Sequence, residues 1–234
     1  MRNLFQPGRS TVHAPNGMVA TSHPLATTSA LHILRMGGNA MDAAIAAVAV
    51  QCVVEPQSTG IGGDCFCLYS PKGKEVIGYN GSGTAPKAAT ADWYVKKGIT
   101  TIEQQTPHSV TIPGAVDAWA RLLSDHGTMS LGDVLTPAIE YAWNGAPVNH
   151  RQSHDWMLCE NLLSNDPTSN ELYLFDGKAP KIGTMVKLPL LAKTLEHIAN
   201  NGREGFYSGW VADDIVSYLT SLGGLHTTDD FHSY

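Results

Sequence analysis

The sequence predicts an α/β fold (in the looser sense α+β), with a short mixed portion followed by a mainly helical one. An alanine-rich run lies between Asn39 and Pro56 and predicts a helix that is small and apolar on every face, so other backbone must pack closely against it. A glycine-dense turn at 60–63 follows at once. Two apolar runs separated by the turn at 70–74 then predict a hairpin. A buried helix, a glycine loop and a hairpin together indicate the centre of an α/β domain.

Local signals define the elements before the alanine-rich helix. Residues 18–21 predict a short strand, and Thr27 or Thr28 can cap the apolar helical pattern that follows. The glycine pair at 37–38 ends that helix, and Asn39 is suited to cap the next one.

The hairpin is predicted from alternation. Phe66 and Leu68 mark its first strand, and residues 76–79 mark its second. Cys65 and Cys67 are two positions apart, so on a strand they point the same way, and we expect both to be reduced packing residues.

The remainder reads as helical. We expect helices at 91–97, 115–123, 130–143, around 153–163, at 188–199 and at 209–222. Pro137 is tolerable only near the first turn of its helix or as a kink. Thr227 followed by Asp229 and Asp230 predicts one more helix start. Because Tyr234 comes barely one turn later, we expect the sequence to be truncated there.

These patterns divide the chain into three parts. Residues 1–17 form a polar N-terminal arm, 18–90 the α/β portion, and 91–234 a mainly α-helical lobe that is truncated at its C-terminal end.

Composition limits the function classes. With 234 residues, 43% hydrophobic residues, 15% charged residues and a net charge of -6, the chain reads as globular. It has no cluster of Lys and Arg for a nucleic-acid surface and no apolar run long enough for a membrane span. Its start lacks a secretory pattern, and its four cysteines do not form a disulfide framework, so we expect a cytoplasmic protein.

Many short motifs, in order, resemble the γ-glutamyltransferase family of N-terminal-nucleophile hydrolases. They are VATSHPLA at 19–26, ILRMGGNAMDAA at 33–44, VEP at 54–56, GIGG at 60–63, AP at 85–86, IPGAV at 112–116, GTMSL at 127–131, GFYSG at 205–209 and GGLHT at 223–227. The resemblance covers nearly the whole chain from about residue 18.

The resemblance implies a four-layer αββα sandwich, of which this chain supplies one outer helix layer, some strands and an all-α lobe. It also implies a partner, the missing C-terminal half or small subunit, in a heterodimer or higher oligomer. The nucleophile is a threonine freed by self-cleavage, whose own α-amino group is the general base. No threonine here matches its context, so we expect no catalytic residue in this chain. No metal or organic cofactor is implied.

The family draws one donor-site residue from this region, an arginine before an Ala-Pro pair that clamps the substrate's α-carboxylate. Ser82 stands in its place, and a serine cannot pair bidentately with a carboxylate. Gly81 and Ser82 are therefore candidate residues of the pocket wall. The alternative is that Ser82 is a plain turn residue. Asp64 replaces a usual glycine and is a third candidate, although pairing within its loop is favoured over substrate contact.

These departures favour the divergent amidohydrolase branch, which includes oxamate-hydrolysing and acylase-like enzymes. A γ-glutamyltransferase proper, acting on γ-glutamyl substrates, is the first alternative. A chain without catalytic function is the second.

Other patterns are weaker. The glycines at 60–63 follow a helix and precede a strand, the reverse of a dinucleotide loop. His150 and His154 can share a helix face as metal ligands do, but no third ligand has a telling spacing, so a solvated face is favoured. The five tryptophans fall on helical patterns and are expected to anchor the core.

Overall fold

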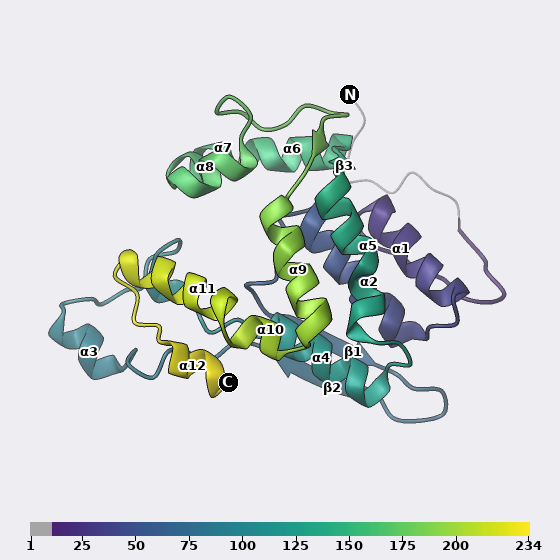
Figure 1. Ribbon diagram of the computed structural model, residues 1–234, viewed down its shortest axis with the longest axis horizontal. Coiled ribbons are helices and arrows are strands. Elements are labelled where there is room, and N and C mark those ends of the chain that lie inside the picture. Colours follow the sequence, from purple (N-terminus) through teal and green to yellow (C-terminus); the bar gives the residue numbers. More distant parts are fainter. Residues whose placement is uncertain (1–10) are drawn as a thin grey trace.

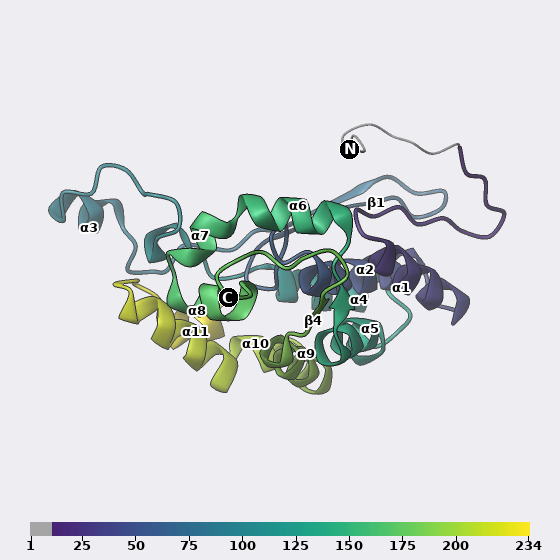
Figure 2. The same ribbon diagram turned by 90° about the horizontal axis from the view of Figure 1, so that it is seen from above.

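The computed structural model describes residues 11–234, so the first ten residues of the predicted arm lie outside it. The helices are α1 Pro24–Arg35, α2 Ala40–Val54, α3 Ala91–Lys96, α4 Ala115–His126, α5 Leu131–Asn144, α6 His150–Leu158, α7 Glu160–Ser164, α8 Pro167–Tyr173, α9 Pro189–Asn201, α10 Glu204–Tyr207, α11 Trp210–Ser221 and α12 Thr228–His232, with a 3₁₀ turn at Pro107–Ser109. The strands are β1 Cys65–Tyr69, β2 Ile77–Gly81, β3 Ala146–Pro147 and β4 Met185–Val186. Figures 1 and 2 show α3 at one end of the molecule and α1 at the other.

Helix α2 is the centre of the core. Of its 15 residues, 11 are buried, and α1, α4 and α5 all pack against it. Asn39 caps it in a reciprocal arrangement with Asp42, as its sequence indicates. Figure 1 shows α1, α2, α5 and α9 side by side, and the α5–α9 contact extends the core away from α2. The prediction of a small-faced, closely packed helix is confirmed.

Two predictions for the first elements are wrong. Helix α1 begins at Pro24, with His23 as its cap, because proline at the first helical position is already set to a helical φ. Thr28 lies inside the helix, where its hydroxyl donates to the Pro24 carbonyl at 2.9 Å. Residues 18–21 form no strand, and none of the strands within residues 11–234 pairs with them.

The predicted hairpin is confirmed. β1 and β2 pair antiparallel, with Cys65 opposite Gly81 and Phe66 opposite Asn80. The Cys65 face is half-buried against α4, whereas Phe66 is 69% exposed on the outer face. All four cysteines are free.

The segment after α5 differs from its prediction. The expected helix at 153–163 is two helices, α6 and α7, which meet at Cys159. α6 begins earlier than expected because Asn149 and Gln152 cap its start reciprocally. Helix α8 and the pair β3–β4 were not predicted, since strands of two residues carry no alternation to detect.

The last predicted helices are present near their predicted positions. The helices expected at 188–199 and 209–222 are α9 and α11, and Thr227 caps α12 together with Asp230. The short helix α10 was missed. Pro137 is the seventh residue of α5, beyond the first turn, and it has no N–H to donate to the Asp133 carbonyl. Trp119 and Trp156 are core anchors as predicted, but Trp210 is 48% exposed.

One continuous apolar core joins α1 and α2 to the helices after residue 90, so the division at that residue stays a prediction. Among residues 11–234, none of the helices has the length and apolarity that crossing a bilayer requires.

Candidate functional site

The candidate site is the segment that leaves β2, residues 81–87, here called the Ser82 loop. The backbone N–H of Ser82 donates to Asn80 Oδ1 at 3.0 Å, and the Ser82 hydroxyl donates to the same oxygen. Both donors of Ser82 are therefore used by Asn80, which lies in β2. Ser82 is half-buried, whereas Asn80 is exposed on the outer face of the hairpin.

Asp64 lies beside this loop. Its Oδ1 accepts a hydrogen bond from the backbone N–H of Gly83 at 3.1 Å, across 19 positions of sequence. Gly81 pairs opposite Cys65, the residue after Asp64. The three residues singled out from the sequence thus come together, and Asp64 pairs with the Ser82 loop and not within its own loop, as the sequence had favoured. Their contact with substrate stays a prediction.

Three glycines allow the chain to pack at this point. A Cβ on Gly83 would overlap the carbonyl of Ile112, and one on Gly114 would overlap the carbonyl of Gly81. A Cβ on Gly81 would lie 2.7 Å from the Ala118 Cβ and from the Cys65 oxygen. Since real Cβ atoms do not approach so closely, the loop can reach the 111–114 segment only with glycine at these positions.

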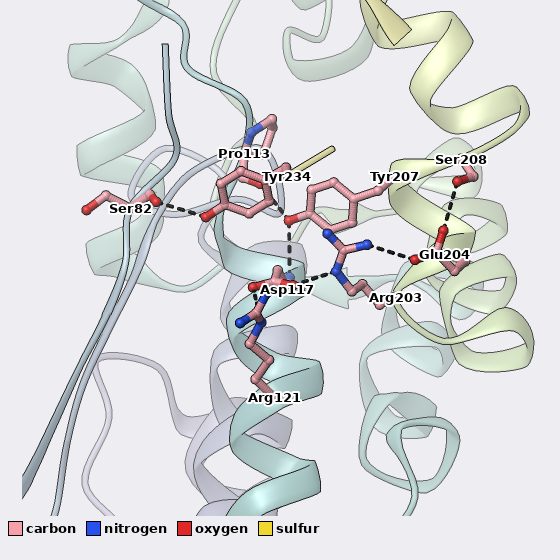
Figure 3. Close-up of polar contacts among 9 residues, drawn as sticks. All are labelled: Ser82, Pro113, Asp117, Arg121, Arg203, Glu204, Tyr207, Ser208 and Tyr234. Carbon is pink, nitrogen blue, oxygen red and sulfur yellow. Dashed lines mark hydrogen bonds and ion pairs between the residues drawn. The ribbon is translucent and has the colours of Figure 1, made fainter. Parts of the chain in front are cut away.

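Tyr234 contacts the Ser82 loop, and Tyr207 packs against Tyr234, as Figure 3 shows. The Tyr234 hydroxyl donates to the Ser82 carbonyl at 2.9 Å, and its ring stacks on that of Tyr207 with centroids 5.5 Å apart. The buried Tyr207 hydroxyl donates to the Pro113 carbonyl at 2.5 Å and accepts from the Asp117 N–H at 3.1 Å. Burial raises the pKa of Tyr207, so its hydroxyl remains a donor.

Asp117 is the charged centre of the same cluster (Figure 3). It is only 4% exposed and pairs with Arg203 Nε at 2.5 Å and with Arg121 Nε at 2.7 Å. Arg203 also pairs with Glu204 at 2.8 Å and lies over the Tyr207 ring, 4.4 Å from its centroid. The hydrogen bond to Asp117 raises the pKa of Arg121. Both arginines of the cluster are thus engaged by carboxylates.

Sequence reasoning missed these supporting residues. Tyr207 lies in the GFYSG motif, which marked the family without indicating a role, and Tyr234 and Asp117 had no local pattern. Tyr234 contacts the loop 152 positions away, and Tyr207 binds Asp117 and Pro113 across 90 and 94 positions; a single sequence contains no signal for such pairs.

The two histidines on α6 belong elsewhere. His150 is exposed and, with Glu55 and Asn149, borders an open depression of about 710 Å³ that contains no residue of the Ser82 loop. In the described part of the chain, no group of three or more His, Cys, Asp or Glu side chains is arranged to hold a metal ion.

A family profile described as Gamma-glutamyltranspeptidase matches residues 26–234. The chain belongs to this family. Among curated relatives it is 40% identical to the glutathione hydrolase-like YwrD proenzyme of Bacillus subtilis over 93% of this chain and 41% of that protein. It is 34% identical to the oxamate amidohydrolase proenzyme of Klebsiella pneumoniae over 94% of this chain and 42% of that protein.

Solved structures of family members have the same fold. The γ-glutamyltranspeptidase of Helicobacter pylori matches with a TM-score of 0.90 at 28% identity, over 96% of this chain and 66% of that one. A cephalosporin acylase from Bacillus halodurans matches with a TM-score of 0.86 at 36% identity, over 99% of this chain and 46% of that one. The predicted N-terminal-nucleophile hydrolase fold is confirmed, with this chain spanning about two fifths of the length of the curated relatives it matches.

Proposed function

We propose that this chain is the N-terminal part of a self-cleaving amidohydrolase of the γ-glutamyltransferase family. A threonine beyond these residues attacks the amide carbonyl carbon, and its own α-amino group takes the hydroxyl proton. That proton passes to the departing amine, and an acyl-enzyme ester remains. Water then hydrolyses the ester, which releases the acid and restores the threonine. The chain contributes scaffold, the pocket wall and partner surface.

The proposed substrate class rests on the hydrogen bonds that Ser82 makes. Its N–H and hydroxyl both donate to Asn80, and the arginines of the neighbouring cluster pair with Asp117 and Glu204. A bidentate clamp for an amino-acid α-carboxylate needs an uncommitted guanidinium, and the Ser82 loop carries none. This favours small acyl amides over γ-glutamyl compounds, in line with the amidohydrolase and acylase names among the relatives.

The outer face of the hairpin supports the proposal of a second half. Phe66 and Leu68 are 69% and 82% exposed there, on the same face as Asn80. A large exposed apolar strip beside a pocket wall is typical of a protein interface. We assign the C-terminal half of the protein, or small subunit, to this face, where it also completes the pocket next to Ser82.

A γ-glutamyltransferase proper is the second candidate, because several relatives are named glutathione hydrolases. A location in the cytoplasm is also part of the proposal, and the four free cysteines support it because thiols stay reduced there. The chemistry calls for no metal or organic cofactor.

The test uses the full-length gene product, analysed by intact mass and by N-terminal sequencing of any fragments. We expect two subunits, the second beginning with threonine, and faster hydrolysis of oxamate or simple acyl amides than of glutathione. Replacing that threonine by alanine is the control and should abolish turnover. Brisk γ-glutamyl cleavage would favour the second candidate. A single inactive species of about 25.0 kDa would favour the remaining alternative, a chain without catalytic function.

A further inference from the structure

Helix α12 and the residues after it lie against both ends of the Ser82 loop. At one end, Tyr234 donates to the Ser82 carbonyl at 2.9 Å. At the other, Asp230 Oδ1 accepts from the Lys87 N–H at 3.0 Å, and Lys87 Nζ donates to the Ser233 hydroxyl at 2.9 Å. The loop is thus held by a segment more than 140 positions later in the chain.

Asp230 divides its two oxygens between two tasks. Oδ2 accepts from the Thr227 N–H at 3.0 Å and from the Thr227 hydroxyl at 2.7 Å, which caps α12, whereas Oδ1 binds the loop at Lys87. Burial alone would raise the pKa of this carboxyl, but the hydrogen bonds from Lys87 and Thr227 outweigh it and lower the pKa. Asp230 therefore binds the loop as a buried carboxylate.

The segment that holds the loop is itself anchored. Phe231 is fully buried, with its ring centroid 6.4 Å from that of Tyr207. Tyr207 is fixed through Pro113 and Asp117, and the Tyr234 ring stacks on it. A side chain in a packed environment can orient a neighbour, because it has few rotamers of its own to choose from.

The loop has reason to need outside support. Ser82 stands between Gly81 and Gly83, and glycine has more backbone freedom than any other residue. Local contacts hold the Ser82 and Gly83 N–H groups, while the Ser82 carbonyl is held by Tyr234. Without Tyr234, the peptide between Ser82 and Gly83 loses one of its two hydrogen bonds and keeps the one from the Gly83 N–H to Asp64.

We propose that Tyr234 and Asp230 are positioning residues that fix the Ser82 loop in the orientation in which it lines the substrate pocket. The inference rests on the proposed function, since it takes the loop as a pocket wall. Such residues act through the loop and lower KM by pre-organisation, with little effect on the chemical step.

The first experiment compares two tyrosine variants of the full-length gene product. Tyr234→Phe removes the hydroxyl that binds Ser82 and keeps the ring. Tyr218→Phe is the matched control, because its hydroxyl donates to Asp166 at 2.5 Å and has no contact with the loop. Two readouts are measured: hydrogen–deuterium exchange of the 80–87 peptide, and KM and kcat for the acyl amide that the wild-type protein hydrolyses best.

For Tyr234→Phe we expect faster exchange across 80–87 and a KM about fivefold higher, with kcat within about twofold of wild type. Tyr218→Phe should change neither readout. Wild-type exchange in Tyr234→Phe would overturn the positioning role. Faster exchange with unchanged KM would overturn the link to the pocket. If the wild-type protein hydrolyses no amide, the proposed function and the pocket assignment fail together, while exchange still decides whether Tyr234 holds the loop.

The second experiment separates the two tasks of Asp230. Thr227→Ala removes the cap of α12 and leaves the Lys87 contact in place, whereas Asp230→Ala removes both. We expect faster exchange in 80–87 only for Asp230→Ala. Equal exchange in the two variants would mean that Asp230 acts solely as a cap, which would overturn its positioning role.

Discussion

The carboxylate of Asp42, fully buried at the start of α2, holds Thr128 across 86 positions of sequence. Oδ1 accepts from the Thr128 N–H at 2.9 Å, and Oδ2 accepts from the Thr128 hydroxyl at 2.7 Å. The same carboxylate accepts from the N–H groups of Asn39 at 2.7 Å and of Met129 at 3.1 Å. Asp42 therefore both completes the cap of α2 and joins α2 to the turn before α5.

Removing the Asp42 carboxylate should destabilise the folded protein. We expect Asp42→Ala to lower the free energy of unfolding of the full-length protein by roughly 3 kcal/mol, because four donors lose the buried, charged acceptor that they share. The matched control is Asp133→Ala in the exposed cap of α5, which should cost about 0.5 kcal/mol. Urea denaturation measures both, and equal losses would contradict the clamp.

Acid should weaken the same clamp. Burial alone would raise the pKa of Asp42, but the hydrogen bonds from Thr128, Asn39 and Met129 outweigh it, so the pKa falls below 3.8. Because the pKa of Asp42 is lower in the folded state, its carboxylate contributes its full stabilisation above pH 3.8. That contribution is lost as the pH falls through the pKa of the folded state. Wild type should therefore lose stability below about pH 4 more steeply than Asp42→Asn, measured by urea titration at stepped pH.

Close packing at the Ser82 loop predicts a contrast between two glycines. Gly83→Ala should lower the free energy of unfolding by roughly 2 kcal/mol and raise KM, because its Cβ would overlap the Ile112 carbonyl. Gly60→Ala is the control, since its Cβ would meet nothing within 4 Å. Its stability should stay within about 0.5 kcal/mol of wild type. A Gly83→Ala protein as stable and active as the control would mean that the loop does not pack as described.

Substrate choice can be tested at Ser82. We propose that Ser82 occupies the position of the family's α-carboxylate clamp. Ser82→Arg would then place a guanidinium there, so γ-glutamyl hydrolysis by the full-length protein should rise relative to acyl-amide hydrolysis, by about tenfold in kcat/KM. Ser82→Gln, of similar reach without charge, is the control. No rise at all in γ-glutamyl activity would mean that Ser82 does not face the substrate.

The cysteines should differ in reactivity. Burial raises the pKa of Cys52 to about 12, so almost none of it is thiolate at neutral pH. Cys159 is partly exposed at the junction of α6 and α7. Iodoacetamide should therefore label Cys159 in the native protein and leave Cys52 unlabelled until denaturant is added, as peptide mass mapping can show. Labelling of native Cys52 at a similar rate would contradict its burial.

The sequence by itself determined the family and most of the local structure. Asn39 and Thr227 each predicted a helix start that the structure has, because a cap depends on neighbours within four positions. The hairpin followed in the same way from alternation around a turn. The prediction of secondary structure failed where the local signal was short. It missed the helix boundary at Cys159 and the two-residue strands β3 and β4.

The arrangement of the candidate site was decided only by tertiary structure. Ser82 and Asp64 were found because they depart from a family pattern, but their supports, Tyr234 and Asp230, act across about 140 to 150 positions. Such contacts depend on how α4, α10 and α12 pack around the loop, and that packing leaves no periodic trace in one chain. A tyrosine hydroxyl or a capping aspartate looks the same in sequence whether it faces water or binds a distant carbonyl or amide.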